Sequence, residues 1–203
     1  MYLKKYLMMI AAALCMLPLS AINPQNSKMK ELNVKKVSVT NIPVESVPAL
    51  MDEEKVAFQP VNTVNWAVFP YAPDVAFRIA HTEDAILLHF KVREASVRAV
   101  AGHDNGPVWE DACVEFFSVP AGDGVYYNME CNCAGTLLIG AGAGRGNRQH
   151  APQEVLDKVQ RWASLGREAF DERVGECAWE VALVIPYSAF FLHDITSLDG
   201  KTL

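Results

Sequence analysis

Three polar side chains recur at every second position near the middle of the chain. Asn128, Glu130 and Asn132 occupy these positions in the otherwise apolar run VYYNMECNC. Because side chains on a β-strand alternate between its two faces, the three polar groups are expected to share one face. Polar groups on an apolar strand must be either solvated or paired, and amides and carboxylates readily bond hydroxyl groups. We therefore predict that this stretch is the functional face of a binding module.

A second carboxylate and two arginines are expected to meet this face. The preceding run WEDACVEFF and the turn AGDG predict a β-hairpin, which places Glu115 roughly opposite Glu130 unless the register slips by one residue. Adjacent carboxylates repel each other, so a cation, a shared proton or arginines must compensate. Arg145 and Arg148 follow in the glycine-rich run GAGAGRGNR and can reach back as bidentate partners.

Several interpretations of these groups remain open. In the first, Glu115, Glu130 and the two arginines form an internal salt-bridge network that only holds the sheet. In the second, Asn128, Glu130, Asn132 and the arginines bond sugar hydroxyls, and in a third the carboxylates hold calcium. A glycosidase pair is rejected, because hydrolysis requires one protonated carboxylic acid placed across a cleft, about 5–9.5 Å from the other. Strand neighbours flanked by arginines would both stay ionised, so no catalysis is expected.

Sugar binding also requires a flat apolar surface, because the C–H face of a pyranose packs against aromatic rings. Trp66 and Trp109 stand at loop–strand edges beside prolines, where an exposed ring would either stack on a sugar or cap the end of the fold. Trp179 alternates with apolar residues and is predicted to be core, whereas Trp162 is ambiguous. Arg98 precedes a polar loop and is either a further sugar contact or a solvated strand residue.

The elements that position these residues are short strands with alternating polarity. The clearest are predicted at 75–81, 85–92 and 178–185, with turn signals between them and very little helix. This pattern is typical of an all-β fold, an antiparallel β-sandwich or jelly roll of immunoglobulin-like type. His81 and His89 are interpreted as strand residues that face solvent.

Charge and the N-terminal segment bear on partners and localisation. The net charge of −6 and the lack of a basic cluster argue against a nucleic-acid partner, and the glycine-rich run lacks the Gly-Lys-Ser/Thr of phosphate-binding loops. Lys4 and Lys5 followed by the apolar run 6–17 predict a cleaved signal peptide over 1–21, rather than a membrane span. The mature chain is therefore expected to be exported, periplasmic or extracellular, with no transmembrane span.

Export would place the remaining cysteines in a compartment that permits disulfides. These are Cys113, Cys131, Cys133 and Cys177. Bridges and buried free thiols remain equally open, although Cys131 and Cys133 on one strand face would be poorly spaced for a bridge, with their Cα atoms about 6.6–7 Å apart.

Several motifs in order resemble a known family. They are WEDACVEFF, YYNMECNCAGT, GRGNR and WEVALVIP, and over residues 66–191 the chain resembles the family 9 carbohydrate-binding-like domains of exported bacterial proteins. The resemblance implies a β-sandwich related to the DOMON group, sugar binding between tryptophans and, in many members, calcium in the fold. Relatives continue past the equivalent of Leu203, so this chain is expected to be truncated at its C-terminus and to lack a closing strand.

The sequence thus predicts a signal peptide (1–21), a lead-in with an edge strand (22–60) and a family 9-like sandwich (61–203). The predicted function is non-catalytic binding of an oligo- or polysaccharide, linked to polysaccharide catabolism, with no certain cofactor. The predicted contacts are Trp66, Arg98, Trp109, Asn128, Glu130, Asn132, Arg145 and Arg148. The alternative is a structural or protein-interaction sandwich of the cell envelope that binds no sugar.

Overall fold

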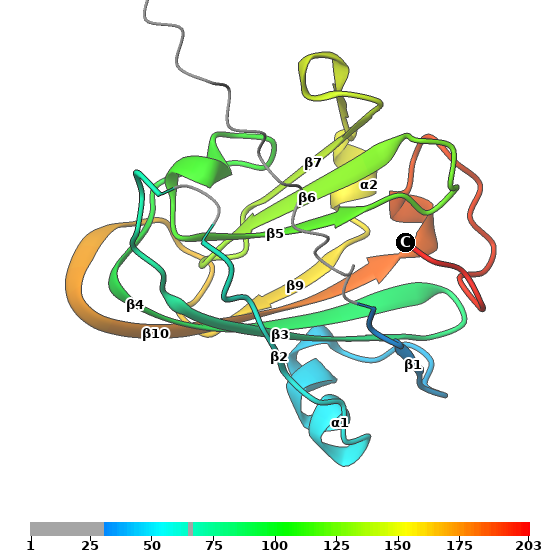
Figure 1. Cartoon of the computed structure of the whole chain (residues 1–203), viewed down its shortest axis with the longest axis horizontal. Helices are drawn as coiled ribbons and strands as arrows, with labels where there is room; N and C mark the ends of the chain where they lie inside the picture. The colour runs from blue at the N-terminus through cyan, green and yellow to red at the C-terminus, as the bar shows by residue number, and fades with distance from the viewer. Residues whose placement is uncertain (1–30, 65–66) are drawn as a thin grey trace, which may run out of the picture. The chain divides into compact units, whose positions relative to one another are not determined.

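The computed structural model describes residues 31–64 and 67–203, and residues 33–203 form one compact unit. Within this unit two β-sheets pack face to face, as Figure 1 shows. The predicted all-β sandwich is therefore confirmed. The predicted signal peptide and Trp66 lie outside the described residues. None of the helices in the described part of the chain is long and apolar enough to cross a membrane.

The larger sheet has six strands in the order β1-β3-β4-β10-β9, with β2 also paired to β3. All of its pairings are antiparallel except that of β1 with β3, which is parallel. Strand β1 lies within the lead-in, where the sequence predicted an edge strand. The strands are β1 (Lys35–Lys36), β2 (Gln59–Pro60), β3 (Asp74–His81), β4 (Ala85–Ala99), β9 (Gln160–Ala163) and β10 (Phe170–Pro186).

The smaller sheet is antiparallel, in the order β5-β6-β7-β8. The predicted hairpin is its centre, and the register places Glu115 directly opposite Glu130, as expected. Gly122 and Gly124 adopt positive φ angles in the β5–β6 connection, a backbone conformation that glycine reaches without strain. The strands are β5 (Cys113–Ser118), β6 (Tyr126–Asn132), β7 (Leu137–Gly142) and β8 (Gln149–His150).

The main core lies between the two sheets and follows from the alternation of each strand. Leu88, Met129, Ile139, Trp179 and Leu183 point inward and are at most 2% exposed, so the prediction that Trp179 is core is confirmed. Burying such side chains is the dominant stabilising contribution, about 1.5–3 kcal/mol each. The four cysteines named above are free thiols.

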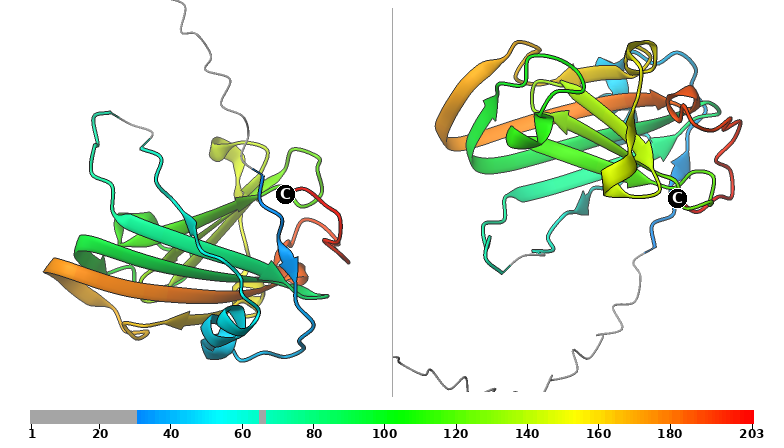
Figure 2. Two further views of the ribbon diagram at one scale, coloured as in Figure 1. Left: turned by 60° about the horizontal axis from the view of Figure 1, so that its bottom comes forward. Right: turned by 90° about the horizontal axis from the view of Figure 1, so that it is seen from above.

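Short helices complete the described unit. The lead-in forms η1 (Val44–Ser46) and α1 (Val47–Glu53), which lies across the outer side of the larger sheet (Figure 2, left). The others are η2 (Val108–Glu110), η3 (Arg145–Asn147), α2 (Gln153–Leu156) and η4 (Tyr187–Ala189).

The prediction that His81 and His89 face solvent is wrong. His89 is 0% exposed and His81 is 9% exposed. His89 does point away from the core between the sheets, but the Phe58 ring lies 5.5 Å from its imidazole and Arg78 donates to its Nδ1. The alternation of β4 thus predicted its face correctly, whereas the segment that covers this face was missed.

Candidate functional site

The polar side chains predicted from the sequence lie on the outer side of the smaller sheet, which is nearest the viewer in the right panel of Figure 2. We call this surface the outer face. It consists of the side chains of β5–β7 that point away from the core, together with the loop arginines above them: Glu115, Phe117, Tyr126, Asn128, Glu130, Arg145 and Arg148.

Asn128 and Glu130 form the buried floor of this face. They are 2% and 5% exposed, and Asn128 Nδ2 donates to Glu130 Oε1 at 2.5 Å. Because this bond fixes the amide, Asn128 presents its carbonyl oxygen elsewhere. Within residues 31–64 and 67–203, neither Asn128 Oδ1 nor Glu130 Oε2 has a hydrogen-bond partner. Buried polar atoms without partners are rare in native proteins and cost about 1–3 kcal/mol each, so these two acceptors point to a missing donor.

The hairpin between β7 and β8 holds both arginines above the floor. The Arg148 side chain lies over Gly140, where an added Cβ would be 3.5 Å from its Cδ atom. Its guanidinium carbon is 6.0 Å from the centre of the Tyr126 ring. Arg145 belongs to η3 and is exposed. The Arg148 side chain thus lies against the outer side of β7 at Gly140.

The internal salt-bridge network, one of the interpretations left open by the sequence, is not formed. Among the described residues, no ion pair within 4.0 Å joins Glu115 or Glu130 to Arg145 or Arg148. Burial raises the pKa of both carboxyls, and the arginines are near enough to oppose part of this rise. The face therefore carries two carboxylates and two guanidinium groups that are close but not in contact.

Burial dominates the electrostatics of the two carboxyls. It raises the pKa of Glu130, against the opposing effects of the Asn128 hydrogen bond and the arginines. Burial also raises the pKa of Glu115, and the neighbouring Glu130 charge adds to this rise. A ligand that donates hydrogen bonds to these carboxylates would stabilise their charged forms and offset the burial.

Exposed aromatic rings occur on the outer face itself and in η2, which contacts β5 and β6. Trp109 lies in η2 and is 54% exposed, while Phe117 is 55% exposed, with its ring centre 6.0 Å from that of Tyr126. Phe117 and Tyr126 were not among the predicted contacts. The signal for Phe117 was available, because it stands two residues after Glu115 on the same strand and so shares its face.

Two predicted contacts support the fold instead of facing a ligand. Asn132 is completely buried, its Nδ2 donates to Asp111 Oδ2 at 2.9 Å, and its Oδ1 accepts from the amides of Ala134 and Thr136. Arg98 Nε donates to the Glu110 carbonyl at 2.9 Å. Both residues hold the ends of η2 and of the β6–β7 turn, so we leave them out of the site.

Asp111 interacts with both Arg98 and Asn132, although the sequence analysis did not identify it. Its side chain is 0% exposed, lies 3.7 Å from Arg98 Nε and accepts bonds from Asn132 and from the amides of Val100 and Ala101. Asp111 follows η2 directly, so these bonds position Trp109 at the Asn132 end of β6.

Calcium was one of the open interpretations of the two carboxylates. Calcium binds six to eight oxygen ligands, usually with several carboxylates. No cluster of three or more His, Cys, Asp or Glu side chains that could hold a metal ion occurs within residues 31–64 and 67–203. We assign no metal to the outer face.

Two comparisons with known proteins found a match. The family model described as carbohydrate-binding family 9 matches residues 45–203. A crystal structure of a candidate carbohydrate-binding protein from Bacteroides uniformis ATCC 8492 is 61% identical in sequence, with a TM-score of 0.82, and the match covers 84% of this chain and 78% of that one. No curated protein matches the chain.

Proposed function

Because the chain belongs to carbohydrate-binding family 9, we propose that its outer face binds a neutral sugar and leaves it chemically unchanged. The observation that supports this proposal most directly is the pair of unpartnered acceptors, Asn128 Oδ1 and Glu130 Oε2. A sugar presents several hydroxyl groups, each of which can donate one hydrogen bond and accept others. Two such hydroxyls would satisfy both buried acceptors.

The charges of the face favour a neutral ligand. The carboxylates of Glu115 and Glu130 are matched in number by the guanidinium groups of Arg145 and Arg148. A hydroxyl that donates to a carboxylate can accept from an arginine at the same time, so a sugar would join the two sets of charges that do not touch each other. An acidic sugar would bring a further negative charge beside two carboxylates with raised pKa values.

The aromatic rings supply the apolar part of the contact. Phe117 lies on the outer face and Trp109 lies in η2. Both are more than half exposed, so either ring can pack against the C–H face of a sugar. Trp66 remains a predicted contact outside the described residues.

The placement of the carboxylates supports binding without turnover. Glu115 and Glu130 are directly opposed on neighbouring strands, which puts their Cβ atoms about 4.5–5.5 Å apart and on one side of any ligand. Glycoside hydrolysis instead needs carboxyl groups that flank the scissile bond from two sides. We further propose that the chain acts in the periplasm or outside the cell, in polysaccharide catabolism, and the predicted signal peptide supports this localisation.

A binding experiment tests the proposed face. The purified chain is screened on an array of neutral and acidic glycans, and the best ligand is titrated by calorimetry. Glu130→Gln removes a charged acceptor while keeping the shape, so the dissociation constant should rise about ten- to hundredfold. Trp109→Ala should weaken binding as well, by removal of the stacking ring.

Glu154→Gln is the matched control, because Glu154 is an exposed carboxylate in α2, outside the outer face. It should bind like the unaltered chain, and circular dichroism should show all variants folded. The proposal fails if the chain binds none of the glycans, or if Glu130→Gln binds as tightly as Glu154→Gln.

A further inference from the structure

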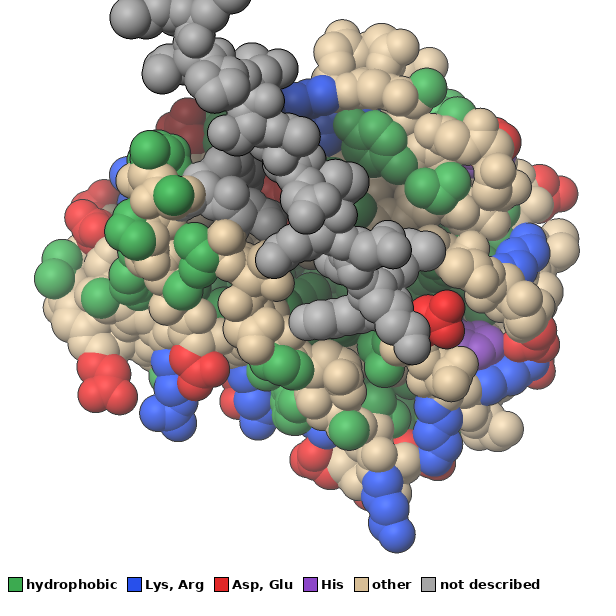
Figure 3. All heavy atoms as spheres, in the orientation of Figure 1, with side chains coloured by type: hydrophobic (Ala, Val, Ile, Leu, Met, Phe, Trp, Pro, Cys, Tyr) green, Lys and Arg blue, Asp and Glu red, His purple; other side chains and the backbone are tan. Residues whose placement is uncertain are grey.

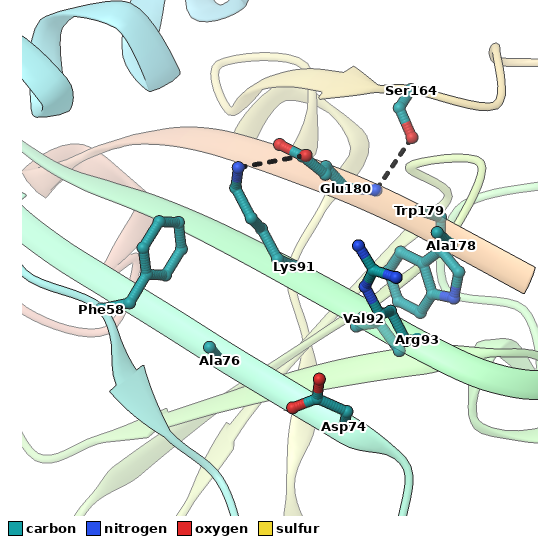
Figure 4. Close-up of a pocket in the computed structure, with 10 residues that line it drawn as sticks. All are labelled: Phe58, Asp74, Ala76, Lys91, Val92, Arg93, Ser164, Ala178, Trp179 and Glu180. Carbon is teal, nitrogen blue, oxygen red and sulfur yellow. Dashed lines mark hydrogen bonds and ion pairs between the residues drawn. The ribbon is translucent and has the colours of Figure 1, made fainter.

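A second hollow lies on the outer side of the larger sheet, on the opposite sheet from the outer face. The lead-in covers only part of this side, where Val47 and Met51 pack against Leu87 and Ala182. Beyond α1 a pocket of about 590 Å³ remains open, as Figure 4 shows. Its size falls within the range of small-ligand pockets, about 300–1,000 Å³. We call it the second pocket, and its lining includes Phe58, Asp74, Ala76, Lys91, Arg93 and Glu180.

The strand register creates this hollow. Two neighbouring rows of side chains cross β3, β4 and β10, and they are Ala76–Lys91–Glu180 and Asp74–Arg93–Ala178. The alanine of the first row, Ala76, is on β3, and the alanine of the second row, Ala178, is on β10. The short methyl groups leave space beside the long side chains of the central strand, and the Phe58 ring forms a wall (Figure 4).

A buried hydrogen-bond chain holds one wall of the second pocket in place. Arg78 Nε donates to His89 Nδ1 at 3.0 Å, so the proton of the neutral imidazole must reside on Nε2. His89 Nε2 then donates to Glu180 Oε2 at 2.7 Å, and Lys91 Nζ lies 3.3 Å from the other oxygen of Glu180. Burial lowers the pKa of His89, which agrees with a neutral ring. Glu180 and Lys91 are therefore paired and positioned before any ligand arrives.

The facing pair Asp74 and Arg93 is not neutralised in the same way. The two residues are partners in the strand register, yet no ion pair within 4.0 Å joins them. Within the described chain, the carboxylate that Arg93 approaches is that of Glu176, at 3.9 Å, with both side chains mostly exposed. Figure 3 shows acidic and basic side chains interspersed along the lower edge of the view, below the larger sheet. Like the outer face, the second pocket combines a carboxylate and a guanidinium group that form no ion pair with each other, and its lining includes an aromatic ring.

We infer that the second pocket is a separate binding site for a neutral sugar residue. The C–H groups of the sugar would lie against Phe58, and its hydroxyls would bridge Asp74 and Arg93. The class of ligand rests on the proposed function, whereas the existence of the site rests on the pocket itself. Because the two sites lie on the outer sides of opposite sheets, one short oligosaccharide cannot fill both. The domain would therefore hold two glycan chains at once.

Nuclear magnetic resonance of the ¹⁵N-labelled chain tests this inference. Glucose, galactose, mannose and xylose are titrated separately, and the backbone amides of Ala76, Arg93 and Ala178 report on the second pocket. We expect saturable shifts of these signals with at least one sugar. The double variant Asp74→Asn/Arg93→Gln should raise the corresponding dissociation constant about tenfold or more, because it removes both charged hydrogen-bonding groups.

Two controls separate this site from the outer face. Glu176→Gln alters the carboxylate near Arg93 outside the second pocket and should leave the shifts unchanged. Glu130→Gln should abolish shifts at the amides of the outer face and leave those of the second pocket intact.

The inference is overturned if the second-pocket amides show no saturable shift with any of the four sugars, or shift equally in the double variant. Shifts confined to the second pocket would overturn the proposed outer face alone. Shifts confined to the outer face would overturn the second pocket alone.

Discussion

The two oxygens of Glu130 are in different situations. Oε1 accepts a bond from Asn128, whereas Oε2 is buried and has no partner among the residues that the structure describes. In the absence of ligand, the ionised carboxylate is therefore only half satisfied, and burial raises its pKa. A residue that is costly to the fold and poised to accept a hydrogen bond is typical of a binding site. Glu130 thus lowers the stability of the unliganded fold and increases the affinity for a ligand.

This opposition gives a pH dependence with a definite sign. The ordinary pKa of Glu130 is 4.5 and its folded-state pKa is higher. Between the two values the folded chain holds a proton that the unfolded chain has lost, so the contribution of Glu130 to the free energy of unfolding declines as pH rises through the folded pKa. Glu130→Gln lacks this decline. Its free energy of unfolding minus that of the unaltered chain should increase above pH 4.5 and then level off, as measured by urea denaturation across pH.

Sugar affinity should change in the other direction. Protonation replaces an acceptor by a donor at Glu130, so the affinity of the unaltered chain should fall as pH drops below the raised pKa. A stability difference between the two chains that is constant across pH would contradict the assignment of Glu130 as a buried, ionisable carboxyl.

At the scale of elements, the β7–β8 hairpin decides where the arginines lie. A Cβ added at Gly142 would be 3.0 Å from both the Cα of Arg148 and the carbonyl oxygen of Asn147, and both atoms belong to the backbone. Gly142→Ala should therefore displace the returning strand, lower stability by about 1–3 kcal/mol and weaken sugar binding. Urea denaturation and calorimetry measure the two effects.

Gly146→Ala provides a matched comparison on the same hairpin. A Cβ at Gly146 would meet no atom within 4 Å, and this glycine has no positive φ angle. The variant should keep both its stability and its affinity. If Gly142→Ala behaved in the same way, the close approach at Gly142 would have no role in placing Arg148.

The strands show what a sequence can and cannot predict. Alternation identified the hairpin, the pairing of Glu115 with Glu130 and the inward face of Trp179, because each depends on local periodicity. The error at His89 arose because periodicity assigns a side chain to a face without indicating what covers that face. Here the cover includes Phe58, which directly precedes β2 and is remote from β4 in the sequence.

The same limit of local periodicity explains which polar residues of β6 were assigned correctly. Glu130 and Asn128 were identified because they break an apolar alternation. Asn132 breaks it equally well, yet its amide is consumed by Asp111 and by the turn backbone. The sequence pattern of one strand does not indicate hydrogen-bond partners that belong to another element or to a turn of unknown geometry.

At the scale of the whole molecule, the described unit is held together without disulfides. Cys113, Cys131, Cys133 and Cys177 are free, and burial raises the pKa of both Cys131 and Cys133 to about 12. Thiolates are the reactive form, so these two thiols should react with a thiol reagent only after unfolding in denaturant. Addition of a reductant should change the free energy of unfolding by less than about 0.5 kcal/mol, whereas loss of a native bridge typically costs about 2–5 kcal/mol.

Thiol titration with and without denaturant, together with urea unfolding in the presence of a reductant, measures this directly. Rapid labelling of the buried thiols in the folded chain would contradict the core packing around β6. A reductant-dependent loss of stability would contradict the free state of the four cysteines.

The anchoring of η2 by Asp111 has a consequence for how this scaffold can vary. The bonds that fix Asp111 come from Asn132 and from the backbone of Val100 and Ala101, and none of them involves the Trp109 ring. The ring at position 109 can therefore change without loss of the bonds that hold η2, provided that the buried Val108 is kept. Exchange of Trp109 alone offers a route to alter ligand preference while the polar floor and the core beneath it stay as they are.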